Sequence, residues 1–130
     1  MSNKTTTKED LKNRTKQFAL RSIKVFQALP KTDEARVIGK QFLRSSTSVA
    51  ANYRAVCRAR SMAEFVAKLG IVIEEADETV LWLELLIESG IISEIRAASL
   101  LKEANEILFI MSASKSTIRE NALKSKNQKI

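Results

Sequence analysis

Five cationic side chains recur between residues 36 and 58 at intervals of 4, 4, 10 and 4 positions. This basic stripe consists of Arg36, Lys40, Arg44, Arg54 and Arg58. On a helix they share an arc of about 80°, with Thr47 and Ala51 filling the gap. Guanidinium groups suit bidentate contact with phosphate, so the stripe predicts binding to a nucleic-acid backbone. A solvated helix face is the alternative, and without interleaved aromatic residues base stacking is not indicated.

Four carboxylates cluster in the acidic stretch of this basic chain, where residues 61–90 hold seven acidic and one basic side chain. They are Glu74, Glu75, Asp77 and Glu78. Metal sites in helical bundles use His together with carboxylates from several helices. This chain has no His, and the cluster lies on one predicted helix, so no metal is expected. Pairing with Arg or Lys of adjacent helices, or of another subunit, is predicted instead.

Candidate nucleophiles are Cys57 and the hydroxyl run Ser45-Ser46-Thr47-Ser48. A hydroxyl or thiol nucleophile needs an adjacent base, and a glycine-rich elbow often presents it. The sequence offers neither a His base nor a glycine-rich loop for phosphate. Hydroxyls within a helix more often allow close packing or bond a carbonyl of the preceding turn. No enzymatic activity and no cofactor are expected.

The overall composition is typical of a small helical domain. The chain has 130 residues, a formal net charge of +7, one Pro, three Gly and one Cys. A chain of this length usually forms one domain. Because Gly and Pro are scarce, a sheet of many strands is disfavoured, and a single Cys excludes an internal disulfide. Apolar runs stop short of a membrane span, and no signal peptide is visible. A cytoplasmic protein without a membrane partner is expected.

Capping residues predict where the helices begin. Thr6 with Glu9 fits a capping box for the first helix, which Pro30 ends, and Thr32 is a plausible N-cap for the second. The third helix is predicted between a capping box at Ser61 and a stop at residues 89–90, where Ser precedes Gly.

A fourth helix is predicted from Ser93 to about residue 118. Short connections make neighbouring helices antiparallel, which favours an all-α, up-down-up-down four-helix bundle over residues 8–118. Residues 1–7 are predicted to be disordered, and residues 119–130 to form a basic, flexible C-terminal tail.

The predicted third helix has apolar residues outside its core stripe. These outer apolar positions are Ile71, Leu81, Trp82 and Leu85. A helix that is apolar on more than one face is usually covered on more than one face, either by two neighbours in one bundle or by another subunit. Self-association through these positions is predicted.

A polar flank borders the apolar stripe of the predicted second helix. Its members are Gln41, Ser45, Ser48 and Asn52. They are predicted to serve structure first, by meeting carboxylates such as Glu75 or Glu78.

Residues 42–54, reading Phe-Leu-Arg-Ser-Ser-Thr-Ser-Val-Ala-Ala-Asn-Tyr-Arg, resemble the four-helix-bundle proteins encoded in intervening sequences of bacterial 23S rRNA genes. Further matches are Arg14-Thr15, Phe18-Ala19, Leu29-Pro30, Gln41, Arg58-Ala59-Arg60-Ser61, Glu64-Phe65, Lys68-Leu69, residues 75–79 and residues 82–85. The resemblance covers residues 10 to 118. It implies a bundle commonly assembled as a ring-shaped homopentamer. The family is also similar to accessory variability proteins of diversity-generating retroelements, which are basic pentameric barrels that bind nucleic acid and a reverse transcriptase. Neither group is associated with enzymatic activity.

One departure from the family pattern follows Arg54. The family usually shows Glu-Ala where this chain has Ala55-Val56. The missing carboxylate either alters packing in the assembly or leaves a binding face more basic. Taken together, the sequence predicts a non-catalytic, oligomeric protein that binds RNA or DNA through a basic surface. The alternative is a protein–protein adaptor, for example an accessory partner of a reverse transcriptase.

Overall fold

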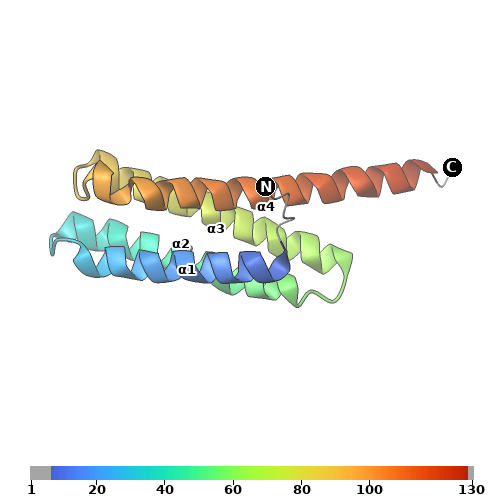
Figure 1. Ribbon diagram of the computed structural model, residues 1–130, viewed down its shortest axis with the longest axis horizontal. Coiled ribbons are helices and arrows are strands. Elements are labelled where there is room, and N and C mark those ends of the chain that lie inside the picture. Colours follow the sequence, from blue (N-terminus) through green and yellow to red (C-terminus); the bar gives the residue numbers. More distant parts are fainter. Residues whose placement is uncertain (1–6, 129–130) are drawn as a thin grey trace, which may run out of the picture.

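The computed structural model describes residues 7–128 and contains four α-helices in that range, with no strand (Figure 1). They are α1 (Lys8–Ala28), α2 (Asp33–Cys57), α3 (Met62–Glu88) and α4 (Glu94–Gln128). Each helix packs against the next one in the chain, and α1 also contacts α4, which closes the bundle. The all-α fold of four helices is therefore confirmed.

Most helices begin and end where the sequence predicts, at residues with short polar side chains or at glycine. Thr32 and Ser61 are the N-caps of α2 and α3, and each side-chain oxygen accepts a hydrogen bond from the backbone N–H three residues later. Gly90, with a φ of 81°, follows the last turn of α3. Glycine adopts this left-handed conformation without steric cost, which is why the helix ends there.

The start of α1 differs from the prediction by one residue. Thr7 is the N-cap, its Oγ1 accepts from the Asp10 N–H at 3.1 Å, and the Asp10 carboxylate accepts from the Thr7 N–H at 3.1 Å. The predicted pairing of Thr6 with Glu9 is therefore wrong as the capping box, and Thr6 itself lies outside the described residues. Asp and Glu both carry the acceptor that a capping box needs, so the sequence pattern alone fits either register.

The greatest difference concerns α4, which continues to Gln128 rather than ending near residue 118. No Gly or Pro occurs after Gly90, so nothing in the sequence forces the helix to stop. In Figure 1, α4 diverges from α3 and projects beyond the end of the bundle at which α3 begins. All side chains of residues 119–127 are exposed. We call residues 119–128 the projecting segment; the predicted flexibility of residues 119–130 stays a prediction.

The core combines apolar side chains with a set of buried hydroxyls. Phe18, Phe42, Leu69, Leu83 and Ile107 are among the largest buried side chains. Five hydroxyl residues are fully buried, and each has its oxygen within hydrogen-bond distance of a carbonyl three or four residues earlier. They are Thr15, Ser22, Ser45, Ser46 and Thr79. No buried side-chain polar atom in the described part of the chain lacks a partner.

We expect Phe42→Ala to lower the free energy of unfolding by about 3–5 kcal/mol, because it removes a fully buried ring from a close-packed interior. Phe109 is the matched control, since its ring is 73% exposed, and its replacement by Ala should cost less than about 0.5 kcal/mol. Urea unfolding followed by circular dichroism measures both values. Equal losses for the two variants would contradict this core.

Candidate nucleic-acid interface and self-association surface

Four members of the basic stripe lie exposed on the outward face of α2. Arg36, Lys40, Arg54 and Arg58 are solvent-exposed, and none forms an ion pair within residues 7–128. The helix therefore presents four free cations on the side away from the core. Such groups are available for phosphate, because no internal carboxylate competes for them.

Arg44, the fifth member of the stripe, faces α3 instead. Its Nη1 lies 3.1 Å from an oxygen of Glu75, and its Nη2 donates to Glu78. Its Nε also lies 3.4 Å from the Gln41 side-chain oxygen. Two carboxylates thus bind its Nη atoms and balance its charge, although its side chain remains 46% exposed. The structure therefore separates Arg44 from the other four cations.

The acidic cluster also contains both paired and unpaired side chains. Glu75 and Glu78 pair with Arg44 of the adjacent helix, as the sequence predicts, whereas Glu74 and Asp77 are exposed and have no ion-pair partner among the described residues. Hydrogen bonds from the Trp82 indole N–H and then from Arg44 hold the pKa of Glu78 below its usual value. No three His, Cys, Asp or Glu side chains in the described range gather as metal ligands.

The polar flank of α2 does not meet these carboxylates. The Asn52 amide donates to the Ser48 carbonyl in its own helix at 2.9 Å, and the Ser45 hydroxyl lies 2.9 Å from the Thr79 hydroxyl of α3. Gln41 reaches Arg44 rather than a carboxylate. The predicted contacts with Glu75 and Glu78 are therefore wrong, because the longer Arg44 side chain takes both positions.

A second arginine that the sequence analysis did not assign joins α1 to α4. Arg14 donates through Nε and Nη2 to the two oxygens of Glu103, at 2.7 and 2.8 Å, and Nη2 also lies 3.0 Å from Glu106. The hydrogen bond to Glu103 raises the pKa of Arg14 above its usual value. Two features of the sequence could have indicated this contact: Arg14 is one of the residues that carry the family resemblance, and the two glutamates are three residues apart on one helix.

The outer face of α3 carries an exposed apolar patch. Ile71, Leu81 and Leu85 are 38%, 48% and 39% exposed. Trp82, which was predicted to belong with them, is half-buried and packs against the core, while its indole N–H donates to Glu78. Glu78 in turn pairs with Arg44 of α2, and the exposed patch therefore has three of the four predicted members.

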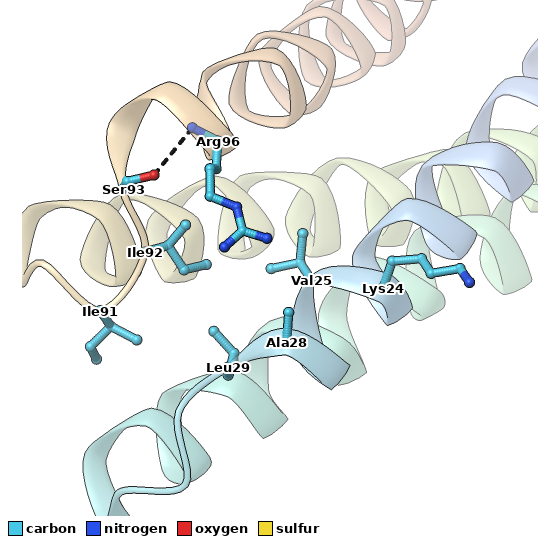
Figure 2. Close-up of a pocket in the computed structure, with 8 residues that line it drawn as sticks. All are labelled: Lys24, Val25, Ala28, Leu29, Ile91, Ile92, Ser93 and Arg96. Carbon is cyan, nitrogen blue, oxygen red and sulfur yellow. Dashed lines mark hydrogen bonds between the residues drawn. The ribbon is translucent and has the colours of Figure 1, made fainter.

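A cleft of about 370 Å³ lies where the end of α1 meets the start of α4 (Figure 2). Its lining is mostly apolar, from Val25, Leu29, Ile91 and Ile92, and the Arg96 guanidinium extends across it while Lys24 points away. The Ser93 hydroxyl lies 3.4 Å from the Arg96 backbone N–H and caps α4. None of the lining residues is a carboxylate, thiol or imidazole.

Comparisons with known proteins agree on a family. A family model described as 23S rRNA-intervening sequence protein matches residues 7–113. A crystal structure of a protein with unknown function from the S23 ribosomal protein family of Bacteroides thetaiotaomicron is 34% identical, with a TM-score of 0.77, and the alignment covers 84% of this chain and 97% of that one. No curated protein matches. Neither comparison bears on the similarity to accessory variability proteins, which stays a prediction. No helix in the described range is long and apolar enough to cross a bilayer.

We expect Glu78→Gln to destabilise the protein at pH 7 by about 0.2–1 kcal/mol, the usual range for an exposed ion pair. The lowered pKa of Glu78 means that its contribution is present above the pKa of the unfolded chain and disappears as the pH falls through the folded-state pKa. Urea unfolding at pH 7 and pH 3 measures this. The stability difference between wild type and variant should shrink at pH 3, and a difference that grows on acidification would contradict the assignment.

Proposed function

Because this chain belongs to the 23S rRNA-intervening sequence protein family, we propose that it is a non-catalytic oligomer that binds RNA or DNA through the outward face of α2. The observation that carries the proposal is the row of four exposed cations without internal partners: Arg36, Lys40, Arg54 and Arg58. Neutralising phosphates with such groups releases condensed counterions, which supplies affinity without base readout. Neither the description of the family nor that of the structural neighbour names an enzymatic activity, and the function of the neighbour is unknown.

Assembly would strengthen this binding. A row of four cations gives modest affinity, but several rows in one particle engage the same nucleic acid at high effective concentration. The exposed patch of Ile71, Leu81 and Leu85 supports self-association, because leaving it in water forgoes about 25 cal/mol for each Å² of apolar surface. The family resemblance suggests a ring-shaped pentamer as the form of this assembly.

We expect Arg54→Ala to weaken binding to a short duplex and to reduce the log–log salt slope by about 0.9, the value for one phosphate contact on DNA. Arg44→Ala should leave that slope almost unchanged and instead lower the free energy of unfolding, because Arg44 is held by Glu75 and Glu78. Arg96→Ala, an exposed arginine on α4, is the control for charge alone. Fluorescence anisotropy between about 50 and 200 mM salt measures the slopes.

Equal slope changes for Arg44→Ala and Arg54→Ala would show that the two arginines are not separated in function. If neither RNA nor DNA binds wild-type protein at low salt, the stripe is a solvated face. The adaptor hypothesis, with a reverse transcriptase or another protein as the partner, would then replace this proposal.

Leu81→Glu tests the self-association surface, because it places a charge at the centre of the exposed patch on α3. We expect a lower oligomer mass by light scattering with an unchanged far-ultraviolet helix signal. Leu20→Glu is the matched control, since Leu20 is 47% exposed on α1, and it should leave the mass unchanged. A monomeric wild type at micromolar concentration would contradict the assembly.

A further inference from the structure

We propose that the outer face of α3 binds the projecting segment of α4 from a second copy of this chain. The inference rests on the self-association in the proposed function and identifies the element that covers Leu81 and Leu85 of the apolar patch. It is carried by two surfaces of one molecule that are opposite in charge and that both expose apolar side chains.

The first surface is a stripe along α3 with an apolar centre and acidic flanks. Asp77, Leu81, Leu85 and Glu88 follow one another at intervals of four, four and three residues, so they share one face of the helix. All four are exposed, and neither acid has an ion-pair partner in the described range. Eleven residues separate the two acids, which corresponds to about 16 Å of helix.

The second surface has the opposite charge and the same order of features. In the projecting segment, Arg119 precedes Ala122 and Leu123, and Lys126 follows. Spacings of three, four and seven residues place them along one side of the helix, and Leu123 is 61% exposed. Arg119 and Lys126 are seven residues apart, about 10 Å of helix, so both fit within the distance between the acidic flanks of α3.

The two surfaces are at opposite ends of a single chain. Glu88 lies at the connection between α3 and α4, whereas Lys126 is 32 residues beyond the start of α4. That distance is about 48 Å along a straight helix. Figure 1 shows the projecting segment at the far end of the bundle from this connection. The charges and apolar residues therefore meet only between two copies.

Isolation of the projecting segment also argues for a partner. A helical stretch of ten residues without tertiary contacts is marginal in water, because its hydrogen bonds alone do not offset the ordering of the chain. Contact between two different surfaces is heterologous, and repetition of such a contact produces a ring or a filament. Repeated contact between α3 of one copy and α4 of the next would therefore produce such a ring or filament.

Charge reversal on each surface tests the pairing. Asp77→Lys with Glu88→Lys reverses the flanks on α3, and Arg119→Glu with Lys126→Glu reverses those on α4. Each double variant should need about tenfold or more higher protein concentration to assemble, because like charges then face one another. The variant with all four changes should assemble like wild type. Lys16→Glu with Lys24→Glu, an equal charge change at exposed positions of α1, is the control.

Native mass spectrometry and light scattering measure assembly, circular dichroism checks folding, and anisotropy on the same samples measures nucleic-acid binding. Loss of mass in both double variants, with recovery in the variant that carries all four changes, supports the proposal. Wild-type mass in every variant would overturn it, yet leave the proposed function intact. A drop in nucleic-acid affinity without a change in mass after reversal on α4 would also overturn it, and would assign the segment to nucleic acid. A monomeric wild type would overturn both this inference and the proposed assembly.

Discussion

Buried hydroxyl groups between closely packed helices are the constraint on which the bundle depends. Ser45 of α2 and Thr79 of α3 are fully buried with their oxygens 2.9 Å apart, so the two backbones must approach closely at this point. An unpaired hydroxyl there would cost about 1–3 kcal/mol. Each buried hydroxyl avoids that cost through a carbonyl of its own helix, which leaves the neighbouring helix free to pack against it. Larger side chains at these positions would separate the helices and break the contacts beyond them.

This close approach also decides which charged groups can bind anything outside the protein. With α2 and α3 in contact, Arg44 reaches Glu75 and Glu78 and becomes part of the packing, while Arg14 does the same between α1 and α4. Many of the residues that carry the family resemblance, including Arg14, Ser45, Val49 and Tyr53, therefore stabilise the fold. The other four cations of the basic stripe have no such partner and lie on the outward face of α2.

Much of the fold follows from local rules that act within a few residues of sequence. Caps such as Thr32 and Ser61, the break at Pro30 and the stop at Gly90 need no tertiary information, so the number and order of the helices could be predicted. The end of α4 could not be predicted in this way, since residues 119–128 contain no stop signal and no clear core stripe. The side on which Trp82 lies and the pairing of Arg14 and Arg44 depend on which residues oppose one another across helices. That register is set by packing of the whole bundle, which helical periodicity does not encode.

We propose that the arginines of α2 divide into one that joins α2 to α3, Arg44, and a set that binds phosphate. Nuclear magnetic resonance of the arginine Nε–Hε groups, recorded while a short RNA or DNA duplex is added, tests this division directly. We expect the signals of Arg36, Arg54 and Arg58 to shift until they saturate, and the signals of Arg44 and Arg14 to stay in place. A shift of Arg44 while the three exposed arginines remain unchanged would contradict it.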